Sequence, residues 1–459
     1  LIYMGHNEFY GAYGTGSNIS LGNNGAFSRF ILKMQKVRLF QAMKSLVNSF
    51  APQQAAVTDA TLMEKITDNR NIPPDSELRQ ITYQNYADNL DVILKKLGKQ
   101  NIPVIMSNLV SNLGDQPPLG KDGKLADQSM TALDYYQKGI TAEDSGRAIE
   151  YFIKARNQDD IPFRAPSGIN SIIAKKAREF DVEMIDMKRA FRDNSDDAIP
   201  GDELFCDHLH PNPTGYHLMA AEFLKKIYTS DILDANPIEI AALKPKYVTQ
   251  LDWEIGGLRV FQLEQKWPFF SDKTQYTVGI DPIRKPVVEI AEDFLFNHHI
   301  WGKAHSDMAD HYLKNDNHQK ACDEFQAILV MFPEKLPYYR KLVDCAKTLK
   351  NWALVARYSE RALPLTDIKG KFYYDLAVGQ YRTGKHGEAI SNFQKALQSQ
   401  QLDRQEITFT HFYQALILAE QEQYDAAYDL LKVVVQEMPG LQTARNFLEE
   451  IKNKTGKNK

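Results

Sequence analysis

Two short stretches of the chain carry side chains whose types and spacing could do chemistry. GHNE follows an apolar run at the start of the chain, and DHLHPNPTGY precedes a helical pattern. In the second stretch, Asp207 stands three residues before His210. On a loop, this spacing lets the carboxylate bend back to the imidazole, fix its tautomer and stabilise the imidazolium. The other ring nitrogen is then left as a general base.

The first stretch adds a hydrogen-bond donor to this pair. Asn7 comes just past an expected strand end, where its side-chain N–H could face a developing oxyanion, and Gly5 permits a tight backbone there. Each motif alone also fits an ordinary structural loop, and Asp-x-x-His is common by chance. His208 and His210 are spaced like metal ligands, but the sequence has no second ligand cluster, so we expect no metal. The two stretches together favour catalysis.

Composition excludes several classes of protein. Of 459 residues, 43% are hydrophobic and 25% are charged, as in ordinary globular proteins, and a formal charge of −4 gives no reason to expect nucleic acid as a partner. Three scattered cysteines make neither a disulfide framework nor a zinc knuckle. No apolar run approaches the roughly 18 residues of a membrane span. The chain begins at Leu1, inside an apolar run, and we expect it to be a piece of a longer protein.

Strand and helix patterns alternate over residues 1–230. Three apolar runs, at 1–4, 102–109 and 182–187, read as strands of a parallel sheet, and amphipathic helices are expected at 76–97, 169–180 and from Thr214. This alternation predicts a doubly wound, flavodoxin-like α/β domain with its ligands at the carboxyl ends of the strands. Residues 131–160 read as an inserted helical hairpin.

The remainder of the chain is predicted to be a connector followed by repeats. Residues 231–300, rich in Pro and aromatic side chains, are predicted to be an ordered connector. Beyond them, Ala321 and Ala389 lie 68 residues apart, which is twice 34, and Ala362 lies 34 residues before Ala396. Small residues at this period, with prolines closing helices, are typical of tetratricopeptide repeats. We therefore expect such repeats over residues 301–457.

The motifs also resemble those of a known family. GHNE and FCDHLHPNPTGYHLMAAEF are similar to the third and fifth blocks of SGNH (GDSL-type) hydrolases, and the trailing repeats resemble a bacterial subgroup with tetratricopeptide repeats. The resemblance implies that Asn7 contributes to an oxyanion hole, that His210 is the base and that Asp207 orients it. Gly5 and Glu8 would support the loop, Glu8 standing where Asp is usual. The nucleophilic Ser of the first block has no counterpart, so we expect the fragment itself to be inactive.

The resemblance implies a serine ester hydrolase or acyl transfer enzyme in the full-length protein, acting on an acyl ester, with repeats that bind a protein partner and no cofactor. It also implies an envelope-associated location, with membrane association through the missing N-terminus. Arg164 is a weak candidate for binding an anionic or carbohydrate substrate, or else forms a structural ion pair. The alternative is a non-catalytic α/β scaffold joined to a tetratricopeptide interaction module. An upstream G-[DEN]-S stretch would favour the enzyme.

Overall fold

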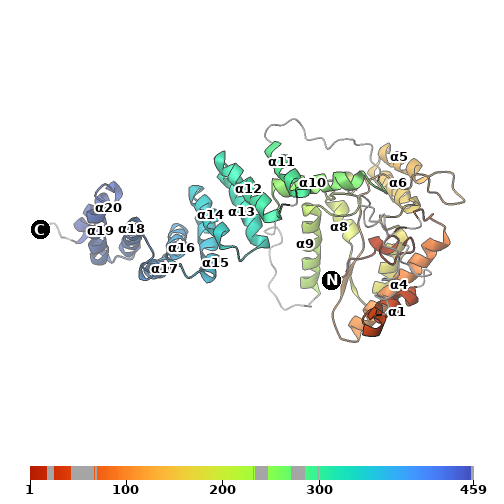
Figure 1. The fold of residues 1–459 in the computed structure, drawn as a ribbon, viewed down its shortest axis with the longest axis horizontal. Coiled ribbons are helices and arrows are strands. Elements are labelled where there is room, and N and C mark those ends of the chain that lie inside the picture. The colour runs from red at the N-terminus through yellow and green to blue at the C-terminus, as the bar shows by residue number, and fades with distance from the viewer. Residues whose placement is uncertain are drawn as a thin grey trace. The chain divides into compact units, whose positions relative to one another are not determined.

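The chain divides into two compact units (Figure 1). The computed structural model describes residues 1–17, 25–42, 67, 70–230, 232, 247–269, 285–297 and 299–455. The first unit comprises Leu1–Pro245 and Gly256–Thr277, and the second comprises Lys246–Ile255 and Val278–Lys459. Within the expected connector at 231–300, residues 231, 233–246, 270–284 and 298 lie outside the described residues. Inside it, α10 (Gln250–Glu264) and α11 (Lys285–Phe296) are helices.

The first unit contains a minimal parallel sheet. Strands β1 (Ile105–Ser107) and β2 (Glu183–Ile185) pair in parallel with Met106 opposite Met184, and Ile2 forms a parallel bridge to Met106. These are the only named strands in the described ranges. The prediction of a doubly wound, flavodoxin-like α/β domain is therefore wrong.

Strand β1 ends where side chains take over the backbone groups of the chain. Just beyond β1, Asn170 accepts a hydrogen bond from the Leu109 amide at 2.7 Å and donates one to the Leu109 carbonyl at 3.1 Å. The next amide, that of Val110, donates to the Tyr3 hydroxyl at 3.3 Å. Backbone groups satisfied in this way have no need of a neighbouring strand. Of the three apolar runs, 102–109 is buried over residues 105–109, whereas residues 1–4 are half-buried or exposed, so the runs predicted neither burial nor strand pairing over their full length.

Helices are the main regular elements among the described residues of the first unit. In chain order they are η1 (His6–Glu8), α1 (Gly25–Met34), α4 (Glu77–Gly98), α5 (Ala132–Ile140), α6 (Ser145–Gln158), α7 (Ser167–Glu179), α8 (Met187–Asp193), η2 (Asp196–Ala198) and α9 (Pro213–Thr229). Helices α5 and α6 lie within the segment 131–160, and α4 begins after Ser76, whose side chain accepts a hydrogen bond from the Arg79 amide as its N-cap. Helix α9, however, is capped by Asn212 and not by Thr214, since the Asn212 side chain accepts from the amides of Thr214 and Gly215.

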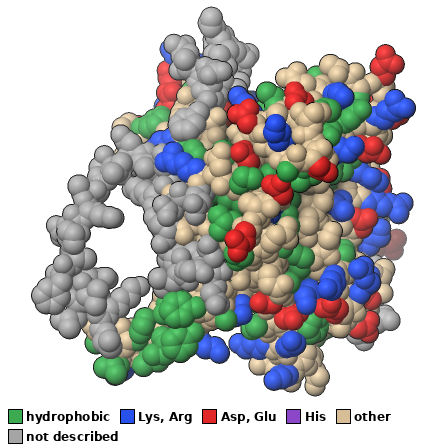
Figure 2. Space-filling model, turned by 90° about the vertical axis from the view of Figure 1, so that its right-hand side faces the viewer, with side chains coloured by type: hydrophobic (Ala, Val, Ile, Leu, Met, Phe, Trp, Pro, Cys, Tyr) green, Lys and Arg blue, Asp and Glu red, His purple; other side chains and the backbone are tan. Residues whose placement is uncertain are grey.

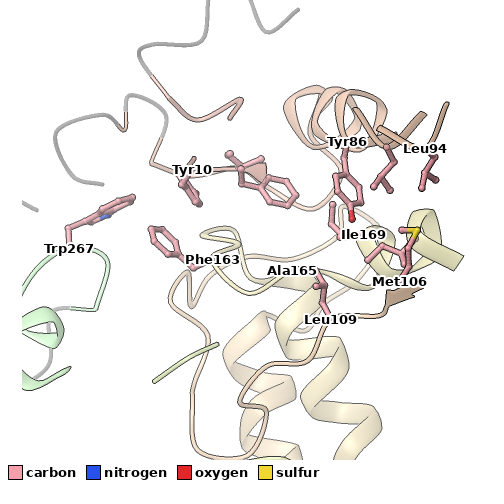
Figure 3. Packing of buried hydrophobic residues seen from close by; sticks show 13 residues of the cluster. Tyr10, Tyr86, Leu94, Met106, Leu109, Phe163, Ala165, Ile169 and Trp267 are labelled. Atoms are coloured by element: carbon pink, nitrogen blue, oxygen red, sulfur yellow. The ribbon is translucent and has the colours of Figure 1, made fainter. Parts of the chain in front are cut away.

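One hydrophobic cluster holds the start of the chain in place (Figure 3). Tyr86 from α4 is fully buried and its hydroxyl donates to the Met4 carbonyl at 2.8 Å. The backbone then turns at Gly5, where φ is +139°, and a β-carbon there would lie 2.9 Å from side-chain atoms of Ile169 and Leu109. A side chain at this position would be both strained and crowded. The turn directs residues 6–8 out of the core.

The second unit consists of helices that pack with their neighbours in sequence. They are α12 (Trp301–Lys314), α13 (His318–Met331), α14 (Leu336–Thr348), α15 (Trp352–Ala362), η4 (Leu363–Leu365), α16 (Gly370–Arg382), α17 (His386–Gln398), α18 (Arg404–Glu420), α19 (Tyr424–Glu437) and α20 (Gln442–Thr455), together with α11. The small residues of the repeat pattern are fully buried: Ala321, Ala362, Ala389, Ala396 and Ala427. Paired helices that pack mainly against their neighbours along the chain are the arrangement of a repeat array.

None of the helices in the described ranges is both long enough and apolar enough to cross a membrane.

Candidate functional site

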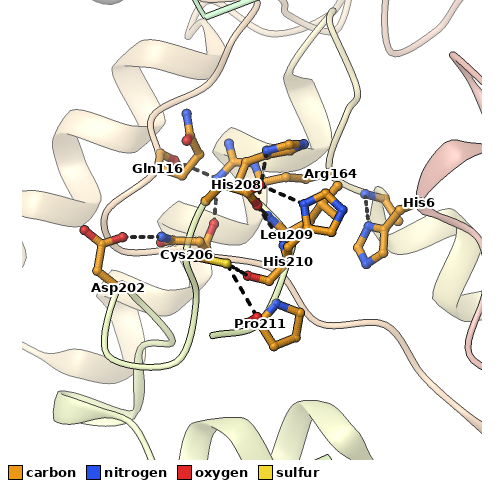
Figure 4. A network of polar contacts seen from close by, with 12 residues as sticks. His6, Gln116, Arg164, Asp202, Cys206, His208, Leu209, His210 and Pro211 are labelled. Atoms are coloured by element: carbon orange, nitrogen blue, oxygen red, sulfur yellow. Dashed lines mark hydrogen bonds and ion pairs between the residues drawn. The ribbon is translucent and has the colours of Figure 1, made fainter. Parts of the chain in front are cut away.

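Asp207 and His210 form a hydrogen-bonded pair on the loop before α9. Figure 4 labels Cys206, His208, Leu209 and His210 of this loop. One carboxylate oxygen of Asp207 lies 2.7 Å from Nδ1 of His210. The other accepts from the backbone amides of Leu209 at 2.9 Å and His210 at 2.7 Å. The loop is closed by the Cys206 amide, which donates to the His210 carbonyl at 2.9 Å. The local backbone therefore fixes the carboxylate against the imidazole, as the spacing in the sequence predicts.

The pair shifts the proton affinity of both its members. Burial works to raise the pKa of Asp207, but the hydrogen bond from His210 and the nearby His208 outweigh it and lower that pKa to about 2. The same hydrogen bond raises the pKa of His210 above its ordinary value, against partial burial. Both shifts favour an ion pair between carboxylate and imidazolium.

Replacing Asp207 with Asn should lower the pKa of His210. Because the pKa of His210 is raised in the folded protein, its ion pair with Asp207 stabilises the fold fully at pH values below about 6.5, the ordinary pKa of His. This stabilisation is lost as the pH rises through the raised pKa of His210. We expect the His210 ring signals in an NMR titration to move at lower pH in Asp207→Asn than in the wild type. Asp193→Asn, at an exposed position on α8, serves as the control. An unchanged His210 titration in Asp207→Asn would contradict the assigned pair.

The pair opens onto a cavity of about 270 Å³ within the first unit. Asn7 lines the same cavity, so the structure brings together Asn7, Asp207 and His210, which lie some 200 residues apart in sequence. Most of the remaining wall is apolar: Phe163, Leu209, Val260, Leu263, Trp267, Pro268 and Phe269. The sequence patterns did not predict this wall, although Trp267, Pro268 and Phe269 lie in the segment noted for its Pro and aromatic side chains.

The other predicted site residues lie elsewhere. Gly5 makes the buried turn before Asn7, and Glu8 is partly buried, which raises its pKa. Arg164 is 2% exposed, and one terminal nitrogen of its guanidinium donates to the carbonyls of Asn112 at 2.8 Å and Gln116 at 2.6 Å. Its second terminal nitrogen lies 3.7 Å from a carboxylate oxygen of Asp159. These contacts correspond to the structural ion pair that the sequence left open as an alternative.

The described lining of this cavity contains no side chain with a nucleophilic hydroxyl or thiol. The nearest thiol in sequence, that of Cys206, donates to the carbonyls of His210 and Pro211, and burial raises its pKa to about 11. A thiol with so high a pKa is a poor nucleophile at neutral pH. The geometry therefore offers an ion pair and an amide beside an apolar cavity.

Comparisons with known proteins found little similarity to this chain. No protein-family model matches the chain, and no curated protein matches it. A solved structure described as "Crystal structure of MamA" aligns with 36% of this chain and 97% of its own length, at 13% sequence identity and a TM-score of 0.28. A likeness at that score supports no conclusion about fold or function.

The resemblance to SGNH (GDSL-type) hydrolases is wrong, because no protein-family model matches the chain and its described part lacks the sheet of such an enzyme. The predicted ester hydrolase or acyl transfer activity and the acyl ester substrate are wrong for the same reason. The described part of the chain is largely helical and carries only the two three-residue strands β1 and β2. The oxyanion-hole role of Asn7 and the general-base role of His210 were implied by this resemblance and lose their support. That Asn7, Asp207 and His210 form a functional site stays a prediction.

Proposed function

We propose that residues 301–457 form a tetratricopeptide-type array that binds a protein partner. The observation that carries this proposal is a row of charged contacts that joins the first helix of each pair to the first helix of the next. An array of this kind buries its core between repeats and leaves a continuous helical face for a partner.

The row runs over α12, α14, α16 and α18. Lys341 of α14 lies 3.0 Å from Asp310 of α12, and Lys371 of α16 lies 3.1 Å from Glu406 of α18. Between them, Asp375 of α16 is 1% exposed and accepts from α14, from Arg340 at 2.6 Å and from Lys347 at 2.9 Å. These contacts support a surface made of four helices side by side, which we call the first-helix row.

The chemistry of the first-helix row suits an extended segment of protein. It carries both signs of charge, and half-buried tyrosines lie on the same helices: Tyr338, Tyr374, Tyr381 and Tyr413. Arg382 lies 5.9 Å from the ring centre of Tyr381 and 5.7 Å from that of Tyr413. Aromatic and Arg side chains with part of their surface open are the residue types that contribute most at protein interfaces.

Reversing two exposed charges of the row should abolish partner binding without unfolding the array. Lys341→Glu with Lys371→Glu removes contacts that, at such exposure, stabilise the fold by about 0–1 kcal/mol each. We expect at least a tenfold loss of the partner recovered by chemical cross-linking to tagged full-length protein in extracts of its source cells, with an unchanged circular dichroism spectrum.

The matched control reverses two exposed charges on second helices. Arg357→Glu on α15 and Lys432→Glu on α19 change the net charge by the same amount. The control variant should retain the partner. Equal recovery with both double variants would refute the proposed surface.

A further inference from the structure

A second cavity in the first unit, of about 360 Å³, shares no lining residue with the cavity at His210. Its wall comes from the chain after β1, from α6, from the start of α7, and from β2 and α8. Pockets of a few hundred Å³ with a few convergent polar groups are the usual form of small-molecule sites.

Arg156 of α6 is buried in this wall without a counter-charge. It is 5% exposed, and its Nη2 donates to two neutral groups, the Ser167 hydroxyl at 2.9 Å and the Asn157 side-chain oxygen at 3.3 Å. Among the described residues, its Nε has no hydrogen-bond partner and no carboxylate lies within ion-pair distance. Burial, together with the charge of Arg164, lowers the pKa of Arg156 to about 10. A buried charge without a partner is costly unless a ligand supplies one.

The rest of the polar lining also favours an anion. The hydroxyl of Ser111, 3% exposed, has no partner in the described part of the chain. Helix α7 begins at the cavity, and a helix N-terminus carries partial positive charge. Three exposed basic residues of α8 line the cavity, Lys188, Arg189 and Arg192.

Among the described residues, Asp186 carries the only carboxylate that lines this cavity. It accepts hydrogen bonds from the side chain of Asn108 and the backbone amide of Arg189. The excess of positive charge at this cavity is confined to its wall. Figure 2 shows Lys and Arg side chains interspersed with Asp and Glu over a face of the molecule, in keeping with the small net charge. Selectivity for an anion must therefore come from the cavity itself.

The remaining wall is hydrocarbon, with Leu113, Ile149, Ile153 and Met184 among its side chains. We propose that the cavity binds a small organic anion, with a carboxylate or phosphate head on Arg156 and an apolar body against α6. The planar guanidinium fits either head through paired hydrogen bonds. The apolar wall explains why an organic anion fits better than an inorganic ion.

Isothermal titration calorimetry of the full-length protein tests the proposal with three probes of one chain length. Hexanoate and hexyl phosphate carry the two candidate heads, and hexanol carries neither. We expect saturable binding of at least one anion and none of hexanol, and the stronger anion identifies the head. Binding of hexanol as tight as that of both anions, or binding of none of the three, would overturn the proposal.

Arg156→Met should weaken binding of the preferred anion at least tenfold, while Arg147→Met, at an exposed position of the same helix, should leave it unchanged. Without ligand, Arg156→Met should melt no lower than the wild type, because it removes an uncompensated buried charge.

A double variant at the exposed rim, Lys188→Met with Arg192→Met, tests the site if Arg156→Met does not fold. It should bind at least threefold more weakly with an unchanged melting temperature. Wild-type affinity in the double variant and in any folded Arg156→Met would refute the site.

Discussion

Replacing Arg79 with Met is expected to destabilise the first unit by about 3–5 kcal/mol, because three backbone carbonyl groups lose a charged hydrogen-bond donor. Arg79 is 2% exposed, and its guanidinium donates to the carbonyls of Asn157 at 2.8 Å, Ile72 at 2.8 Å and Asp159 at 2.7 Å. It therefore ties α4 to the end of α6 and to the chain that precedes α4. Met keeps most of the hydrocarbon but donates nothing, so these carbonyls lose the donor that satisfied them.

Urea unfolding of the full-length protein, followed by hydrogen exchange in α4, measures this loss within the first unit. Arg178→Met, at an exposed position of α7, is the matched control and should change the free energy of unfolding by no more than about 0.5 kcal/mol. A loss below about 1 kcal/mol for Arg79→Met would show that these hydrogen bonds do not hold the unit together.

Replacing His305 with Ala is expected to destabilise the second unit by a similar amount, about 3–5 kcal/mol. His305 is fully buried, with Nδ1 at 2.5 Å from Glu324 and Nε2 at 3.2 Å from Asp252. Burial alone would lower the pKa of His305, but hydrogen bonds to these two carboxylates raise it. Glu324 is 1% exposed, so removing His305 leaves a buried carboxylate without its cation.

The variant Glu324→Gln tests this explanation because it removes the uncompensated charge. In the His305→Ala background it should recover part of the lost stability, measured by hydrogen exchange in α13. His299→Ala, at a half-exposed histidine paired with Asp293, should have little effect. Equal losses for His299→Ala and His305→Ala, or a further loss on adding Glu324→Gln, would contradict the proposed role of the buried pair.

The sequence predicted helices better than strands, for a physical reason. Helix signals are local: Ser76 caps α4, and the hairpin of α5 and α6 begins with a capping box at Thr131. How far a strand extends depends on residues that are distant in the sequence. Here the side chains of Asn170 and Tyr3 accept hydrogen bonds from backbone amides that an adjacent strand would otherwise have bonded. Three short apolar runs could not reveal this.

The site was predicted in part. The contact between Asp207 and His210 is local and follows from their spacing, and both lie at one cavity with Asn7. The aromatic wall around Trp267 could not be placed, because it belongs to a segment that the sequence presented as a connector. Arg156 was also missed. It lies on the apolar side of α6 with Ile149 and Ile153, and a charged residue on such a stripe was the available signal.

The error in assigning a family came from short motifs. GHNE and DHLHPN comprise ten residues in all, and an Asp–His pair on a loop also serves to fix that loop, as the hydrogen bonds of Asp207 to two backbone amides demonstrate. Motifs of that length establish neither the sheet nor the nucleophile that a hydrolase needs.

Photo-cross-linking from the first-helix row tests the central proposal, partner binding by the repeats, most directly. Benzoylphenylalanine placed at Asp344 of α14 occupies an exposed position near the charges of Lys347 and Arg340, and the same probe at Glu360 of α15 occupies an exposed position on a second helix. In the full-length protein, we expect a discrete cross-linked protein from position 344 and none from position 360. Cross-linking from position 360 alone, or from neither position, would contradict the proposal that the first-helix row binds a protein partner.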